Sequence, residues 1–228
     1  MTDMALSSRN CVPRLAAAVL SSTALLAPLS SCSSSPEGDD TAPNTHAISQ
    51  DASASATKAE RLGLTVLDTV PHLPHTFTQG MEVDPDGNLL IGTGLYGQSK
   101  LLRVRPGSLN PLEEIALNNS HFGEGITQTD AGIWQLTWKS GTAILRDSTT
   151  FAELNHAEYD GEGWGLCNAG SELIMSDGSA ELRHLAPETF AERGSRTTVT
   201  LEGSPVDNLN ELECVDGQVY ANGWMSED

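Results

Sequence analysis

Basic residues are scarce in this sequence. Its 228 residues include 12 Lys and Arg against 31 Asp and Glu, which gives a formal net charge of -19 at pH 7. A surface of this sign repels phosphate groups, so nucleic acids and anionic membrane surfaces are excluded as main partners. Such a charge is typical of a solvated, soluble surface, and we expect a monomer.

Long apolar runs are also missing. The run from Leu15 to Leu29 is shorter than the ~20 residues that a membrane-spanning helix needs. It follows Arg9 and Arg14 and leads into Leu-Ser-Ser-Cys, which completes the three-part layout of a secretory signal. Leu-Ser-Ser-Cys also resembles a bacterial lipobox, whose cysteine becomes the lipidated first residue of the mature protein. We therefore predict a lipoprotein signal peptide over residues 1–31, with plain secretion as the alternative.

The segment that follows has little that could form a core. Residues 32–61 are mostly Ser, Ala, Thr, Asp and Pro, a composition that favours a disordered tether. A lipid on Cys32 would then attach the chain to the bacterial cell membrane through the lipid anchor only, on the extracytoplasmic side. Residues 62–228 are expected to form the folded domain.

Cysteines are few. Cys11 and Cys32 belong to the signal and the lipobox, which leaves Cys167 and Cys214 in the folded domain. Outside the cytoplasm two such cysteines often pair, so we expect a disulfide, with two free buried thiols as the alternative. No third and fourth ligand stands at metal spacing, so no metal site is expected.

Helical periodicity is absent beyond Leu62. Short apolar runs end at Gly, Asp, Asn or Ser, as strands and tight turns do, so an all-β fold is predicted. Four runs align at the marker residues Gln79, Glu124, Trp164 and Asn210, which are separated by 45, 40 and 46 residues. Four-stranded units at this period are typical of β-propeller blades, and a sandwich with evenly spaced hairpins is the alternative.

The position of the marker residues suggests a common site. In a propeller the inner strands line a central channel, so residues at their entrances converge on one pocket. The fourth repeat stops after its second strand, near Trp224, which predicts a C-terminally truncated propeller of about three and a half blades. Leu64 to Val70 has the pattern of a further strand that lacks a partner in its own repeat.

Several motifs together resemble one family. They include P-H-L-P-H-T-F-T-Q-G from Pro71, F-G-E-G from Phe122, G-E-G-W-G-L from Gly161 and L-N-E-L-E from Leu209, and the likeness extends to Trp224. These motifs are similar to those of the plant and bacterial type of glutaminyl-peptide cyclotransferase. The resemblance implies a five-bladed β-propeller and an aminoacyltransferase that needs no metal and no other cofactor. Such an enzyme converts the N-terminal glutaminyl residue of a peptide or protein to pyroglutamate and releases ammonia.

The resemblance also implies the site residues. Glu124 is implied as the catalytic residue. The implied substrate-binding residues are Phe77, Gln79, Trp138, Trp164, Asn210 and Trp224. The chemistry agrees, because a carboxyl that moves a proton from the attacking α-amine to the departing amide nitrogen serves both steps, and burial beside indole rings would raise its pKa. The Gln79 and Asn210 amides would donate hydrogen bonds to the developing oxyanion, and the indole rings would exclude water.

Other polar groups are interpreted as structural. Glu162 repeats the Glu-between-glycines pattern of Glu124, but its phase in the repeat favours a turn or a rim position. Glu211 and Glu213 alternate along an inner strand, where they suit interblade hydrogen bonding. The segment Asp84-Pro-Asp-Gly-Asn lacks the glycine at the sixth position and the late glutamate of a calcium loop, so a hairpin turn is expected.

Two rival functions remain open. A non-catalytic propeller that binds N-terminal peptides would not need Glu124. A metal-dependent propeller lactonase would need a ring of Asp, Glu and Asn ligands, which the marker residues do not supply. The family pattern also continues into a fifth blade with a further lysine, and no Lys of this sequence takes that place by motif. The activity of the chain as given is therefore an open question.

Overall fold

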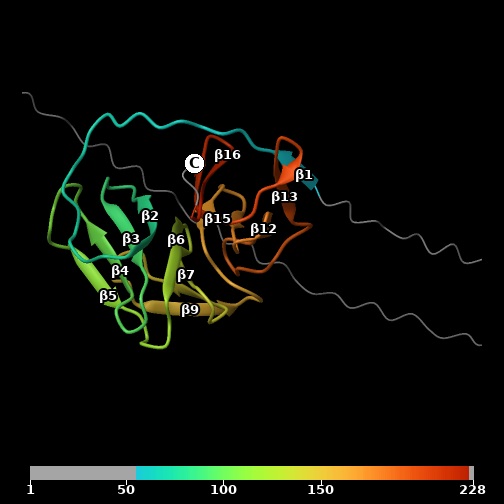
Figure 1. Cartoon of the computed structure of the whole chain (residues 1–228). Helices are drawn as coiled ribbons and strands as arrows, with labels where there is room; N and C mark the ends of the chain where they lie inside the picture. The colour runs from blue at the N-terminus through green and yellow to red at the C-terminus, as the bar shows by residue number, and fades with distance from the viewer. Residues whose placement is uncertain (1–54, 226–228) are drawn as a thin grey trace, which may run out of the picture. The chain divides into compact units, whose positions relative to one another are not determined.

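Short antiparallel sheets make up the computed structural model, which describes residues 55–225 (Figure 1). The first sheet runs β2 (Thr78–Val83), β3 (Leu89–Thr93), β4 (Lys100–Val104) and β5 (Glu113–Ala116), in that order across the sheet. The second repeats this meander with β6 (Gly123–Thr129), β7 (Gly132–Thr137), β8 (Thr142–Arg146) and β9 (Glu153–Glu158). Strands that follow one another in sequence are thus neighbours, as short turns dictate.

The third sheet has additional strands at its outer edge. Its meander consists of β10 (Leu166–Asn168), β11 (Leu173–Met175), β12 (Glu181–Leu185) and β13 (Thr197–Leu201). The short β14 (Ser204–Pro205) pairs with β13, and so does β1 (Ser55–Lys58), which runs parallel to it. The last sheet is the hairpin of β15 (Leu209–Val215) and β16 (Gln218–Gly223). The all-β prediction and the four-stranded period are confirmed.

The first strand of each sheet packs against the first strand of the next. Strands β2, β6, β10 and β15 are neighbours in this order, and β15 also contacts β2, so the four inner strands surround a common axis. The side chains between the sheets form the core. One cluster between the second and third sheets contains Trp134, Leu145, Leu166, Met175 and Phe190. Trp134 is 1% exposed there, as expected of a residue between blades.

Glycine residues allow the inner strands to approach so closely. A Cβ atom on Gly80 would lie 2.8 Å from Ile126 N, and one on Gly125 would lie 2.6 Å from Trp164 O. On Gly165, a Cβ atom would lie 2.1 Å from the carbonyl oxygen of the next inner strand. Each of these glycines directly follows a marker residue. The recurring glycine is therefore explained by packing between sheets.

Two expectations for the N-terminal part of the domain are wrong. Residues 55–58 were assigned to the tether, but they form β1, and Ala59 continues the contact by donating its N–H to Thr200 O at 2.8 Å. Leu64 to Val70 was expected to be a strand, but the structure gives this segment no strand, and Leu64 is 97% exposed. An alternating pattern alone does not supply the partner strand that a β-ladder requires.

The remaining N-terminal predictions concern residues that the structure does not describe. The signal peptide over residues 1–31, the lipidated Cys32 and the tether up to residue 54 lie outside the described residues. Within residues 55–225, no helix has the length and apolar character needed to span a bilayer.

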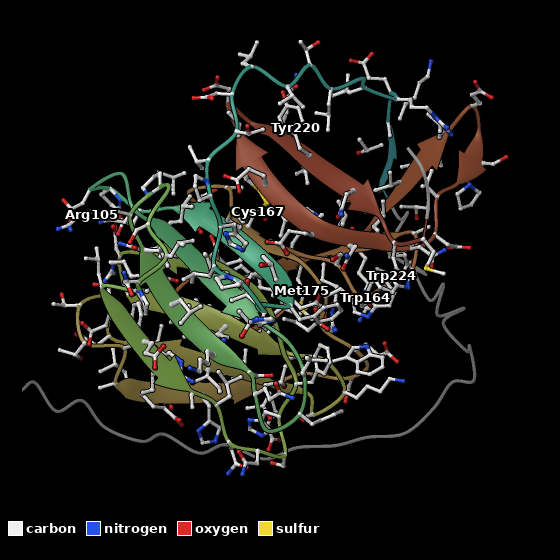
Figure 2. All side chains as sticks on the ribbon, turned by 60° about the vertical axis from the view of Figure 1, so that its left-hand side comes forward. Arg105, Trp164, Cys167, Met175, Tyr220 and Trp224 are labelled. Atoms are coloured by element: carbon white, nitrogen blue, oxygen red, sulfur yellow. A yellow bond between two sulfur atoms is a disulfide. The ribbon has the colours of Figure 1, made fainter. Side chains whose placement is uncertain are left out.

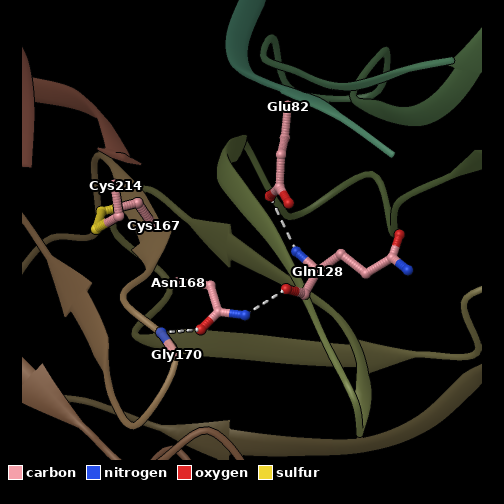
Figure 3. The surroundings of a disulfide bond; sticks show 6 residues. All are labelled: Glu82, Gln128, Cys167, Asn168, Gly170 and Cys214. Atoms are coloured by element: carbon pink, nitrogen blue, oxygen red, sulfur yellow. Dashed lines mark hydrogen bonds between the residues drawn. A yellow bond between two sulfur atoms is a disulfide. The ribbon is translucent and has the colours of Figure 1, made fainter. Parts of the chain in front are cut away.

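A disulfide joins the third and fourth sheets. Cys167 on β10 and Cys214 on β15 are bonded, with their Cα atoms 5.4 Å apart and a sequence separation of 47 positions (Figure 3). Nearby, Asn168 Nδ2 donates to Gln128 O at 2.8 Å, which connects β10 back to β6. Gln128 N in turn donates to Glu82 Oε2 on β2 at 3.0 Å. The inner strands are thus tied together by covalent and hydrogen bonds.

Candidate active site

The central pair of the site is Gln79 and Glu124. Gln79 Nε2 on β2 donates a hydrogen bond to Glu124 Oε2 on β6 at 2.8 Å. The two residues are 45 positions apart in sequence, and the Glu124 residue is only 4% exposed. The structure therefore brings the first two marker residues into direct contact.

Local irregularities in the strands position these side chains. The register of β2 against β3 shifts between Thr78 and Gly80, the residues that flank Gln79. The register of β6 shifts between Gly123 and Ile126, around Glu124. A β-bulge inserts residues without a ladder partner and redirects their side chains, which is common beside active sites.

The third irregular strand carries the last marker residue. On β15 the register shifts between Leu209 and Leu212, which flank Asn210. The main-chain oxygen of Asn210 accepts a hydrogen bond from Ser176 Oγ at 2.6 Å. Three of the four marker residues thus lie at bulges, while Trp164 lies just before β10 begins. The repeat seen in the sequence corresponds to a repeated backbone distortion.

The environment of Glu124 favours its neutral form. Burial raises the pKa of Glu124 from 4.5 to about 8; the hydrogen bond from Gln79 opposes this change, and the negative charge of Glu162 adds to it. A desolvated carboxyl with a carboxylate nearby releases its proton reluctantly. At neutral pH Glu124 is therefore mainly protonated and able to donate a proton, as a general acid must be.

Two indole rings share Glu162 as their hydrogen-bond acceptor. Trp138 follows β7, and its ring centroid lies 5.4 Å from that of Phe122. Trp164 lies before β10, and its ring covers Gly178, where a Cβ atom would come within 2.7 Å of the indole. Both indoles donate to one carboxylate, Glu162, from Trp138 Nε1 at 2.6 Å and from Trp164 Nε1 at 3.0 Å. Both rings are partly buried.

Three further aromatic residues form a cluster with Trp138. Phe77 and Phe122 pack edge to face with their centroids 6.2 Å apart, and Tyr96 packs against Phe122 at 5.5 Å. Phe77 is 41% and Tyr96 is 52% exposed, so this aromatic group faces solvent. Exposed aromatic clusters of this kind are frequent at binding sites. Phe77 thus lies beside the other predicted residues.

Trp224 is the last of the predicted residues along the chain. It follows β16, and its backbone N–H donates to Asn208 O at 2.8 Å. It is 46% exposed, and Figure 2 labels it together with Trp164. The side-chain contacts thus form two groups. Gln79 and Glu124 make one pair, and Phe77 and Trp138 are joined through Phe122, with Trp164 sharing the Glu162 acceptor of Trp138. The negative charge of Glu162 acts on Glu124 and links the two groups electrostatically, while Asn210 and Trp224 make backbone hydrogen bonds.

Further carboxyl groups lie on the inner strands. Glu211 Oε1 accepts the backbone N–H of Met81 at 3.1 Å, in agreement with its expected interblade role. Burial raises the pKa of Glu211 well above its ordinary value, and it also raises the pKa of Glu82 and Glu213. Within residues 55–225, no group of three or more His, Cys, Asp or Glu residues is arranged to hold a metal ion.

The other polar candidates have structural roles. Asp84 Oδ1 accepts the backbone N–H groups of Asp86 and Asn88 at 3.0 and 2.8 Å, and Asp84 Oδ2 pairs with Arg103 Nε at 2.9 Å. This confirms the predicted hairpin turn between β2 and β3. Asp177 Oδ1 likewise accepts the N–H of Ser179 in a turn.

The sequence interpretation missed two groups of site residues. Phe122 lies inside F-G-E-G, and Tyr96 lies in T-G-L-Y-G-Q-S from Thr93, which also resembles the family, but an aromatic residue beside glycine is compatible with ordinary core packing. Glu162 was assigned to a turn or rim because of its phase in the repeat. The matching Glu-between-glycines pattern was the available signal, and it was not sufficient on its own.

These features together define a β-propeller-like protein with a buried, hydrogen-bonded carboxyl group on one inner strand and two indoles that share one carboxylate acceptor. A family model described as glutamine cyclotransferase matches residues 41–228, and the chain belongs to this family. The chain is 33% identical over 165 residues to a glutaminyl-peptide cyclotransferase of Arabidopsis thaliana, a match that covers 71% of this chain and 51% of the relative. The chain thus spans about half the length of that curated relative.

Solved structures agree with the family assignment. The glutaminyl cyclase of Myxococcus xanthus superimposes with a TM-score of 0.65 at 32% identity, covering 76% of this chain and 70% of that one. A protein of unknown function from Bacteroides caccae superimposes with a TM-score of 0.51 at 17% identity, covering 66% and 57% of the two chains. The second likeness concerns the fold alone.

Proposed function

We propose that this chain carries the central part of the active site of a glutaminyl-peptide cyclotransferase. The substrate is a peptide or protein with an N-terminal glutaminyl residue, and the products are the pyroglutamyl peptide and ammonia. The observation that carries the proposal is the buried Glu124, held by Gln79 at 2.8 Å and mainly protonated at neutral pH. Family membership and the cyclase relatives support it.

The reaction is a proton-balanced substitution. The α-amine nitrogen forms a bond to the side-chain amide carbon and closes a five-membered ring, a step that proximity favours strongly. Glu124 donates its proton to the departing nitrogen, and the bond between that nitrogen and the carbon breaks. The resulting carboxylate accepts the proton that the α-nitrogen loses, so Glu124 ends the cycle protonated. No metal is needed in these steps.

Gln79 acts mainly on Glu124. Its amide nitrogen has two N–H donors, and one of them is used in the hydrogen bond to Glu124 Oε2. The second N–H and the Asn210 side chain are proposed to donate to the developing oxyanion. Phe77, Trp138, Trp164 and Trp224 are proposed to bind the substrate and exclude water, and an indole face also attracts a cationic N-terminus.

Two further features are proposed, the number of propeller blades and a lipid anchor. We infer that the propeller is of the five-bladed type, because the motifs follow the order of that family. We also propose that Cys32 is lipidated outside the cytoplasm, which the sequence Leu-Ser-Ser-Cys supports. Mass spectrometry of the protein expressed in a bacterium tests the lipid, and size-exclusion chromatography tests the expected monomer.

Ammonia release tests the proposed function directly. The purified chain is incubated with a peptide that begins with Gln, and the same peptide with an acetylated N-terminus is the control. The free peptide should lose ammonia above the rate without enzyme, and the acetylated peptide should not react because it lacks the nucleophile. Glu124→Gln should lower the rate about 10²- to 10⁴-fold, the usual contribution of a general acid–base. An unchanged rate in Glu124→Gln would contradict this mechanism.

The rival function is a non-catalytic propeller that binds N-terminal peptides. It predicts binding of the Gln peptide without any loss of ammonia. A binding module has no need for a buried, protonated carboxyl group beside the peptide, because burying Glu124 costs stability. We therefore favour the enzyme.

A further inference from the structure

Glu162 lies at the junction between the second and third sheets. It belongs to the loop between β9 and β10, directly before Gly163 and Trp164. One of its oxygens, Oε2, accepts two hydrogen bonds from two different indoles. Trp138 Nε1, next to the end of β7, lies 2.6 Å away, and Trp164 Nε1 lies 3.0 Å away.

The other carboxylate oxygen has a separate partner. Glu162 Oε1 pairs with Lys139 Nζ at 3.3 Å, and the same Nζ lies 4.0 Å from the centroid of the Trp138 ring. Lys139 thus contacts both the carboxylate and the indole face. Partial burial of Glu162 favours its neutral form, but the hydrogen bonds from Trp164, Trp138 and Lys139 outweigh this and lower its pKa. The carboxylate is therefore charged at neutral pH.

An indole N–H can only donate, so its orientation depends on where an acceptor lies. Trp138 and Trp164 come from separate sheets, and a shared acceptor fixes the position of each relative to the other. A turn residue at the rim of the site would not need these two hydrogen bonds. A hydrogen bond to a charged group is also stronger than a neutral one.

We propose that Glu162 is a positioning residue that holds the indoles of Trp138 and Trp164 as adjoining walls of the substrate site. This inference rests on the proposed function, since the walls are assigned to the cyclotransferase substrate. Glu162 itself touches none of the reacting atoms in this scheme. It acts through the two rings and through its charge beside Glu124.

The charged and titratable groups around this arrangement come from several elements. Lys139, in the turn after β7, faces Glu162, and Glu124 on β6 interacts with its charge. Glu124 is itself faced by Gln79 on β2, by Glu211 on β15 and by Tyr159 after β9. Removal of the Glu162 charge therefore also changes the proton affinity of Glu124.

The indole N–H signals test the positioning without reference to activity. The chain has four Trp residues, and the signals of Trp138 and Trp164 are assigned in ¹H–¹⁵N spectra with Trp138→Phe and Trp164→Phe. On acid titration both signals should move together, with a midpoint below the ordinary pKa of Glu. In Glu162→Gln neither signal should show this titration. Independent movement in the wild type, or persistent titration in Glu162→Gln, would overturn the proposal.

Steady-state kinetics test the consequence for the substrate. Glu162→Ala should lower kcat/KM about ten- to hundredfold, with a marked increase in KM, because two hydrogen bonds to a charged acceptor are lost. Glu162→Gln should recover much of the KM, since an amide oxygen still accepts hydrogen bonds. Glu158→Gln, an exposed residue at the end of β9, is the matched control and should stay within about twofold.

The two kinds of measurement separate the possible failures. A wild-type chain that releases no ammonia contradicts the proposed function, while the titration of the indole signals still decides whether Glu162 positions the rings. An active enzyme in which Glu162→Ala keeps the wild-type KM and kcat would overturn the role of Glu162 at the substrate site.

Discussion

Gln79 donates a hydrogen bond to Glu124 across the junction between the first two inner strands, and this contact couples two backbone irregularities. Each residue lies at a register shift of its own strand, and their side chains meet at 2.8 Å. A regular ladder would direct alternate side chains to opposite faces at fixed intervals. The bulges allow the acid and the amide to meet inside the molecule.

The first prediction concerns the pH dependence of this pair. The hydrogen bond from Gln79 lowers the pKa of Glu124, so Gln79→Ala should raise that pKa further above about 8. The alkaline limb of the kcat/KM profile should therefore move to higher pH, while kcat falls about tenfold because the carboxyl is less well oriented. A pH–rate profile on a Gln peptide measures both effects. An alkaline limb that moves to lower pH would contradict the assignment of Glu124 as the titrating acid.

The second prediction concerns stability. The folded-state pKa of Glu124, about 8, lies above its ordinary 4.5. Below the unfolded-state pKa the carboxyl is neutral in both states, and the free energy of unfolding is at its highest. It falls as the pH rises above 4.5, and the loss is complete once the pH has passed the folded-state pKa of about 8. Glu124→Gln removes this ionisation and should make the fold more stable than the wild type at pH 9, by on the order of 3 kcal/mol.

Urea unfolding at pH 5 and pH 9 measures the difference. The two proteins should be close in stability at pH 5 and diverge toward pH 9. Glu82, Glu211 and Glu213 also have raised pKa values. The free energy of unfolding of the variant should therefore still fall as the pH rises, but less steeply than that of the wild type. A Glu124→Gln variant with the same pH dependence as the wild type would show that Glu124 is not the buried acid.

The third prediction concerns the disulfide. Cys167 and Cys214 join β10 to β15, so the bond ties the hairpin β15–β16 to the third sheet. Reduction should lower the free energy of unfolding by about 2–4 kcal/mol, as expected for a loop of this length. Chemical unfolding with and without a reducing agent measures it, and the double variant Cys167→Ala/Cys214→Ala is the control. That variant should not respond to the reducing agent.

The architecture could be predicted from sequence because its repeat carries packing information. Gly80, Gly125 and Gly165 are needed where one inner strand touches the next, and the same requirement places glycine directly after three of the four marker residues. The shared phase of the markers predicted that Gln79 and Glu124 lie near one another, but it did not predict their direct hydrogen bond. A residue pattern that recurs along the sequence thus predicts a structural unit that recurs in the fold, provided that each unit packs against the next in the same way.

The features that could not be predicted depend on single contacts between distant residues. The role of Glu162 depends on two indole N–H groups that approach it from different sheets, and its local sequence pattern is the same as that of Glu124. Strand β1 is formed by residues whose composition suggests a tether, because its backbone hydrogen bonds to β13 do not depend on side chains. The β-strand propensity of the residues does not predict which strands pair through backbone hydrogen bonds.

The last prediction tests the packing explanation of the repeat. In Gly165→Ala the new Cβ would lie 2.1 Å from Asn210 O and 2.8 Å from the Glu211 Cα, both backbone atoms that cannot move away cheaply. The third and fourth sheets must therefore separate, and we expect a loss of at least about 1–3 kcal/mol with a lower Tm. Gly63→Ala is the matched control, since a Cβ there meets nothing within 4 Å, and it should leave the Tm unchanged. Thermal unfolding by circular dichroism compares the two variants, and equal Tm values would mean that the recurring glycine is not required by contact between the inner strands.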